Sequence, residues 1–157
     1  NEISLLAYHL PLDKHPEIGN NALAAKEFKM EHLQEFAEVG LMGDIPPCSF
    51  DDLLKNVRDI FQTDPLVFAY GPERIQRIGI CSGGADRYIE EAISAGLDAF
   101  ITGEFSEPTM HQAKEGHIHF IGAGHYATER LGVLALGAYL STKFNVDVEF
   151  VDIYNPV

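Results

Sequence analysis

The sequence predicts an α/β fold: a layered, mixed, largely parallel sheet with flanking helices. Short apolar runs of strand length alternate along the whole chain with longer stretches of helical spacing. Glycines or prolines close several of these segments, among them Gly40, Pro46, Gly96 and Gly116. Because alternating strands and helices pack as crossover units, this order favours parallel pairing with right-handed connections.

The first elements are a strand over 3–8 and a polar turn over 9–16. Two prolines within six residues of that turn, Pro11 and Pro16, are expected to forbid a helix there. A helix capped by Asn20 or Asn21 should follow, because its apolar residues recur at helical spacing: Leu23, Ala24 and Phe28.

A second helix is expected over 32–39, ended by Gly40, and then a short strand over 41–45. Ser49 or Asp51 can cap the next helix. Its apolar stripe consists of Leu53, Leu54, Val57, Ile60 and Phe61.

The second half of the chain alternates more regularly. The expected strands are 66–70, 75–81, 99–103, 117–121 and 146–153, the last alternating as VDVEFVDI. The expected helices are 86–95, a short one from 106 to 114, and a long one that ends near Phe144. With no linker or low-complexity segment visible, residues 1–157 form a single α/β unit.

Composition excludes several classes of protein. The chain has 157 residues, an apolar share of 46% and a formal charge of −13, with 11 basic and 24 acidic residues. Such an acidic chain is not expected to bind nucleic acid or an anionic membrane as its main partner. The two cysteines have no paired spacing, and the longest apolar run is half of a membrane span, so a cytoplasmic protein is expected.

The run Gly124-His125-Tyr126-Ala127-Thr128-Glu129-Arg130 is the most informative stretch. It lies between a strand and a helix, where α/β proteins build their sites. His125 and Glu129 are four residues apart, so they share one face of a helix. They can hold one divalent metal, or each can hold one of two; a solvated surface pair is the alternative.

His9 and Asp13 lie on the proline-stiffened turn at the end of the first expected strand. A rigid loop at this edge of a sheet often presents ligands. From this stretch alone the structural interpretation is favoured, in which Asp13 caps a turn and His9 binds backbone.

Two further strand ends carry weaker signals. Cys81-Ser82-Gly83-Gly84-Ala85 can receive an anion on its backbone amides, or it can be a tight turn that needs glycine. Cys81 itself is expected to be a small buried thiol. Glu104 can be a general base, a partner of a metal ligand, or a solvent-facing residue. His111, His117 and His119 are placed outside the site.

Together, four strings resemble the Nif-three-like family, whose members are named GTP cyclohydrolase I type 2 homologues and bind two metal ions. They are YHLPLDKHPEIGNN (8–21), ICSGGA (80–85), DAFITGE (98–104) and GHYATERLG (124–132), and the closing VEFVDIYNPV is also similar. The match runs in order along the chain, and GHxATE with the HxPLD turn is specific.

The resemblance implies a ligand set. Carried over residue by residue, it implies that Asp13, His125 and Glu129 bind metal, with Glu129 bridging two ions of iron, zinc or manganese and His9 standing close by. The family's adjacent histidine pair has no counterpart here, and the chain opens at Asn1 without a methionine. The chain is therefore expected to be roughly the C-terminal two-thirds of a longer protein, with weakened metal binding.

The resemblance also frames function. It implies a metal-dependent hydrolase in which two ions activate water against a small, nucleotide-like molecule. The alternative is a metal-binding interaction or regulatory protein without turnover. A ring-like homo-oligomer, a hexamer in the family, is implied in either case.

Overall fold

The computed structural model describes residues 2–153 and 155. Among these, six strands form one sheet in the order β1-β2-β4-β5-β6-β3. The strands are β1 (Glu31–Phe36), β2 (Gly40–Ser49), β3 (Leu66–Ala69), β4 (Arg74–Cys81), β5 (Ala99–Thr102) and β6 (His119–Gly122). The helices are α1 (Leu10–Asp13), α2 (Asn20–Glu27), α3 (Phe50–Phe61), the 3-10 turn η1 (Asp86–Tyr88), α4 (Ile89–Ser94), α5 (Thr109–Glu115) and α6 (His125–Phe144).

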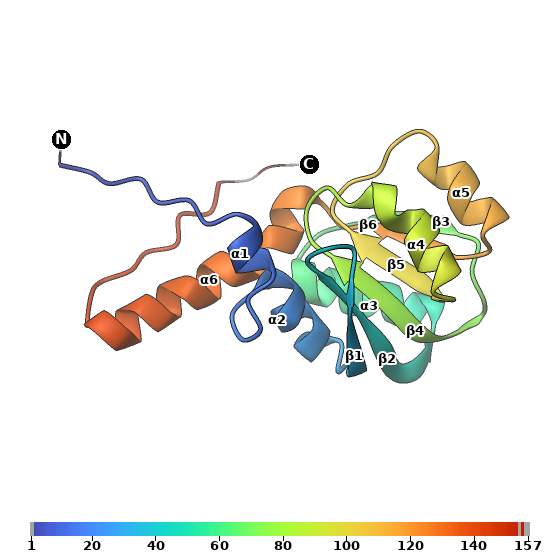
Figure 1. Cartoon of the computed structure of the whole chain (residues 1–157), viewed down its shortest axis with the longest axis horizontal. Coiled ribbons are helices and arrows are strands. Elements are labelled where there is room, and N and C mark those ends of the chain that lie inside the picture. Colours follow the sequence, from blue (N-terminus) through green and yellow to red (C-terminus); the bar gives the residue numbers. More distant parts are fainter. Residues whose placement is uncertain (1, 154, 156–157) are drawn as a thin grey trace.

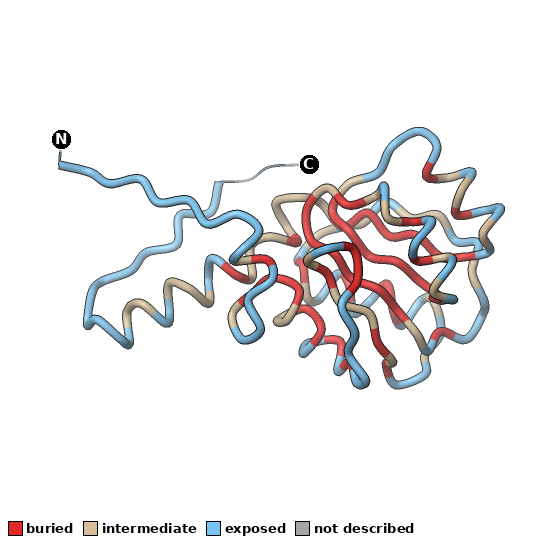
Figure 2. The backbone as a smooth tube through the Cα atoms, in the orientation of Figure 1, coloured by how far each residue is buried: buried red, intermediate tan, exposed pale blue. Residues whose placement is uncertain are grey.

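Helices cover both faces of the sheet, so the molecule has three layers (Figure 1). On one face, α2, α3 and the start of α6 pack on strand residues such as Ile78, Ile80 and Ile101. On the other face, α4 and α5 pack on Phe100 and Phe120. Neighbouring residues of β5 therefore serve opposite faces, as the two-residue repeat of a strand requires. Figure 2 shows that the buried chain is concentrated in this sheet and its nearest helices.

The sheet is mixed, but less parallel than the alternation of elements indicates. Only β4–β5 and β5–β6 are parallel pairs. The pairs β1–β2, β2–β4 and β3–β6 are antiparallel. The turn 37–39 between β1 and β2 is too short for a crossover helix, so these strands must form a hairpin. Ala37 and Glu38 both have positive φ, which suits a tight hairpin turn.

This hairpin corrects the helix expected over 32–39. The segment forms β1, which is exposed along all but its last residue. Since neither face of β1 is buried, its sequence carries no two-residue repeat. Hydrogen bonding to β2 decides its structure instead.

Two expected strands, 3–8 and 146–153, are also wrong. Both segments are irregular and exposed, and an extended chain becomes a strand only beside a partner that takes its hydrogen bonds. The turn over 9–16 differs in the other direction, because α1 forms there with Pro11 in its first turn. Proline is tolerated at that place, where backbone N–H groups have no partner within the helix.

The far half of α6 extends beyond the sheet (Figure 1), and a Cβ on its Gly137 would lie 2.9 Å from Val148 Cγ1 of the segment that follows α6. None of the helices in the described part of the chain has the length and apolar character needed to cross a membrane.

Candidate metal centre

The predicted site residues meet in one cavity at the ends of β4, β5 and β6. A cavity of about 280 Å³ is lined by residues from the start of α1, the turn after β4, the loop after β5 and the first turns of α6. His9, Asp13, Glu104, His125 and Glu129 all contribute to its wall. The parallel pairs β4–β5 and β5–β6 bring these strand ends together.

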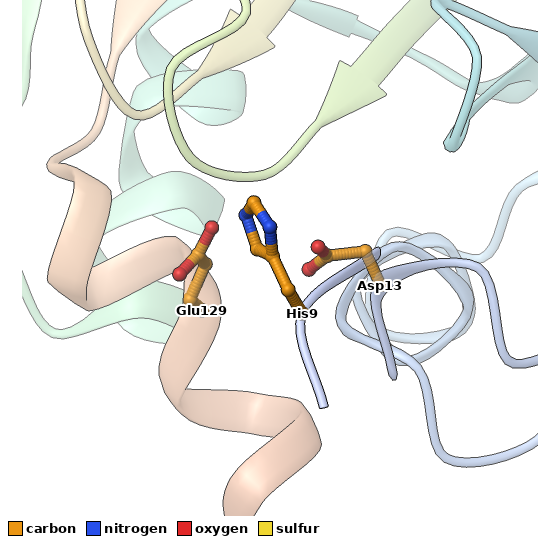
Figure 3. A group of neighbouring side chains, drawn as sticks. All are labelled: His9, Asp13 and Glu129. Atoms are coloured by element: carbon orange, nitrogen blue, oxygen red, sulfur yellow. The ribbon is translucent and has the colours of Figure 1, made fainter. Parts of the chain in front are cut away.

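His9, Asp13 and Glu129 form the closest group of possible metal ligands. One ligand atom from each lies within 4.8 Å of the other two. Figure 3 shows the His9 ring between the two carboxylates, which come from α1 and α6. His9 is therefore a member of this group, whereas the resemblance implies only that it stands close to the ligands.

His125 joins the group from the first position of α6. Its Nε2 lies 3.2 Å from Glu129 Oε1, as the four-residue spacing predicts. Its Nδ1 lies 2.5 Å from Glu104 Oε1, so the ring stands between two carboxylates. Burial by itself lowers the pKa of His125, but the hydrogen bond to Glu104 and the charges of Glu129 and Glu104 outweigh it and raise the pKa overall.

Buried polar side chains hold Asp13 in place. Asp13 is 5% exposed, and its Oδ1 accepts hydrogen bonds from Asn20 Nδ2 at 2.8 Å and Ser82 Oγ at 3.1 Å. Asn20 Oδ1 in turn accepts from the backbone N–H of Gly132 at 2.6 Å. These bonds tie α1, the turn after β4 and α6 into one unit, and sequence reasoning missed the role of Asn20.

The turn after β4 does not offer a free set of amides for an anion. The N–H of Ser82 donates to Asn21 Oδ1 at 2.9 Å, and that of Gly83 donates to Thr128 Oγ1 at 3.0 Å. The N–H of Ala85 donates to Thr102 Oγ1 at 3.2 Å. The tight-turn interpretation of this segment therefore fits the structure, and the anion-loop interpretation does not.

Gly83 is required both by its backbone and by the site. Its φ is +70°, and a Cβ there would lie 2.4 Å from Glu129 Oε1 and 3.2 Å from His125 Nε2. The carboxylate of Glu129 and the ring of His125 thus occupy the space that a side chain on residue 83 would need.

Burial shapes the titration of the groups around the cavity. Burial raises the pKa of Glu129, and the charge of His125 only partly opposes this. Burial, with the charge of Asp13, raises the pKa of the Cys81 thiol to about 12. Cys81 is therefore an inert buried thiol, as expected, and not a nucleophile.

His119, one of the histidines placed outside the site, is buried and has a structural role. His119 Nε2 donates to Pro72 O at 2.9 Å, its Nδ1 accepts from the Gly71 N–H at 3.3 Å, and its ring stacks on Phe50. This agrees with its exclusion from the site.

Comparisons with known proteins identify the family of this chain. A model of the Duf34/NIF3 (NGG1p interacting factor 3) family matches residues 1–156. The GTP cyclohydrolase 1 type 2 homolog of Pseudomonas aeruginosa is 48% identical, and that of Haemophilus influenzae 45%, each over 162 residues. Each alignment covers 99% of this chain and 64% of the relative, so the chain spans about two-thirds of those proteins' length.

A solved structure shares the fold. Protein ybgI, of unknown function, has a TM-score of 0.90 and 41% identity, with 98% of this chain and 63% of that chain covered. The resemblance drawn from GHxATE and HxPLD is therefore confirmed over nearly the whole sequence. With the family match, the near relatives and the shared fold in agreement, this chain belongs to the Duf34/NIF3 family.

Proposed function

We propose that Asp13, His125 and Glu129 are ligands of divalent metal ions, with His9 beside them. One observation carries the proposal: side chains from opposite ends of the chain converge on one cavity, with His9, Asp13 and Glu129 ligand atoms within 4.8 Å of one another. Mixed nitrogen and oxygen donors suit zinc, iron or manganese.

The surroundings of these side chains also fit a metal ion. Among the described residues, the two side-chain donors that reach the Asp13 carboxylate both converge on Oδ1. The second oxygen, Oδ2, is then the one offered to a ligand. The space above Gly83, which a side chain would fill, adjoins Glu129 Oε1 and His125 Nε2.

For the full-length protein we propose two ions, which Asp13, His125 and Glu129 would help to hold. When bound, such ions supply Lewis-acid activation of water and of a polar substrate bond. The chain's own residues would fix this site, because Asn20 and Ser82 orient Asp13.

The activity we propose is metal-dependent hydrolysis of a small, nucleotide-like molecule. The relatives' name, GTP cyclohydrolase 1 type 2 homolog, supports this reaction class. Arg87 and Tyr88 line the same cavity, and the guanidinium of Arg87 lies 4.5 Å from the centre of the Tyr88 ring. A cation beside an aromatic ring suits a substrate with an anionic group and a planar ring.

The alternative is a metal-binding protein without turnover, and one observation favours it. The two carboxylates nearest the His125 ring, Glu104 and Glu129, both contact its nitrogens. Neither is then free to serve as a general acid or base. A ring-like homo-oligomer stays a prediction under either function, to be checked by light scattering.

Metal loading separates these outcomes. The protein is loaded with Mn²⁺, Fe²⁺ or Zn²⁺, its bound metal is counted by elemental analysis, and GTP hydrolysis is followed. Asp13→Ala should lose both metal and turnover, whereas Asp147→Ala, an exposed acidic control, should keep both. Metal without turnover in the parent favours the alternative, and a parent that binds no metal overturns the proposal.

A further inference from the structure

Glu104 and Glu38 are the acidic residues among those lining the cavity that the ligand set leaves out, and of the two Glu104 contacts His125. We infer that Glu104 is a positioning residue: it holds the ring proton of His125 on Nδ1 and so keeps Nε2 free for a metal ion. The inference rests on the proposed metal site and assigns a separate role within it.

The distances around the ring carry the first step. Glu104 Oε1 lies 2.5 Å from Nδ1, whereas Glu129 Oε1 lies 3.2 Å from Nε2. A neutral imidazole has one N–H, and the two carboxylates compete to accept it. The shorter contact assigns the proton to Nδ1, on the side of Glu104.

The position of this proton matters because His125 and Glu129 can otherwise form a hydrogen bond with each other. With the proton on Nε2, His125 would donate it to Glu129, and both groups would be turned away from an ion. A proton and a metal ion cannot occupy the same lone pair of Nε2. Glu104 removes this internal hydrogen bond by offering a better acceptor on the opposite side of the ring.

The loop that carries Glu104 is held in place at the preceding residue, Gly103. The Gly103 N–H donates to Gly83 O at 2.8 Å, and the Gly124 N–H donates to Gly103 O at 2.9 Å. A Cβ on Gly103 would lie 2.7 Å from His125 Cα, so only glycine lets this loop approach α6 so closely. The loop after β5 and the first residue of α6 are thereby fixed relative to each other.

Zinc affinity provides the test, measured by competition with a chromophoric chelator. Glu104→Ala should weaken zinc binding about 10- to 100-fold, the usual effect of removing a carboxylate behind a ligating histidine. Glu104→Gln keeps a carbonyl acceptor and should lie between the parent and Glu104→Ala. Glu107→Ala, an exposed acidic residue on the same loop, removes the same charge and should leave affinity unchanged.

A second readout separates positioning from general stability. In the zinc-loaded parent, the Nδ1–H of His125 should give a low-field, slowly exchanging proton resonance. That resonance should vanish in Glu104→Ala, while the thermal unfolding midpoint of the metal-free protein stays close to that of Glu107→Ala. If Glu104→Ala does not fold, Glu104→Gln carries both measurements.

The outcomes distinguish this inference from the site on which it rests. If the parent and Glu129→Ala bind zinc equally, the metal site itself is wrong. If Glu129→Ala loses zinc but both Glu104 variants bind like the parent, the site stands and the positioning role is wrong.

Discussion

The sheet body (residues 20–132) and the terminal segments (residues 2–9 and 145–153) differ in how far they bury their apolar side chains. In the sheet body, Ile78, Phe100 and Ile121 are fully buried. In the terminal segments, Leu5 is 93% exposed and Ile153 is 73% exposed. Among the described residues, every buried one lies between Asp13 and Gly132.

This contrast shows which region contributes most to the free energy of unfolding. Burial stabilises a fold roughly in proportion to the apolar area removed from water, about 25 cal/mol per Å². The terminal segments remove little of theirs, so the sheet body carries the stability. Of the residues that line the cavity, Glu104, His125 and Glu129 belong to the sheet body. His9 belongs to the N-terminal segment, and Asp13 lies between the two regions.

The largest effect should come from the centre of the sheet body. Phe100→Ala removes a fully buried ring that packs edge-on against Phe36 and Phe120, at centroid distances of 5.3 and 5.7 Å. We expect a loss of about 3–5 kcal/mol in the free energy of unfolding, measured by urea denaturation. A loss below about 1 kcal/mol would mean that the two regions do not differ as described.

Thiol labelling offers a chemical view of the same contrast. Because the pKa of Cys81 is raised to about 12, little of its thiolate is present at pH 8. The thiolate fraction, and with it the labelling rate, should increase with pH up to about pH 12. In Cys48→Ser protein, Cys81 should label about a thousandfold more slowly when native than when unfolded.

Adding Ser4→Cys supplies the matched thiol in a terminal segment. Ser4 is exposed, so this thiol should label as fast in the native protein as in denaturant. Equal labelling of the two thiols in the native protein would contradict the burial of Cys81.

Two glycines with nearly the same backbone angle separate strain from site geometry. Gly83 and Gly96 have φ of +70° and +68°, but a Cβ on Gly96 meets nothing within 4 Å. Gly96→Ala should cost about 1 kcal/mol in unfolding free energy, from the left-handed backbone alone. Gly83→Ala must also displace Glu129, so we expect about 2–3 kcal/mol together with lost zinc binding.

The smallest effects should lie in the terminal segments. Leu5→Ala and Ile153→Ala should each change the free energy of unfolding by less than about 0.5 kcal/mol, because both side chains are already exposed. Urea denaturation beside Phe100→Ala measures this. A cost near 2 kcal/mol for either one would show that its segment is covered in solution.

Predictability from sequence follows the same division. Most elements of the sheet body were predicted, because burial on one face leaves a repeat of 2 or 3.6 residues in the sequence. The exceptions have a common cause: β1 is exposed, and the segments 3–8 and 146–153 lack a neighbouring strand, so pairing decides their structure. Pairing leaves no pattern in a single segment.

The site divides similarly. Local spacing predicted that His125 and Glu129 would lie side by side on α6. The approach of Asp13 was implied only by the family resemblance, since no local pattern links α1 to α6. The contact of Glu104 with His125, and the bridge that Asn20 makes to Gly132, depend on the tertiary fold and left no signal beyond the presence of polar residues near strand ends.

The bridge from Asn20 to Gly132 also bears on the order in which the parts of the cavity come together. Asp13 and Glu129 are more than a hundred residues apart in the chain, and so are Asn20 and Gly132. The contact between Asn20 and Gly132 therefore cannot form until α6 has been synthesised. The cavity should therefore be among the last parts of this structure to close, and a fragment that ends before α6 should hold Asp13 without the side chains that face it.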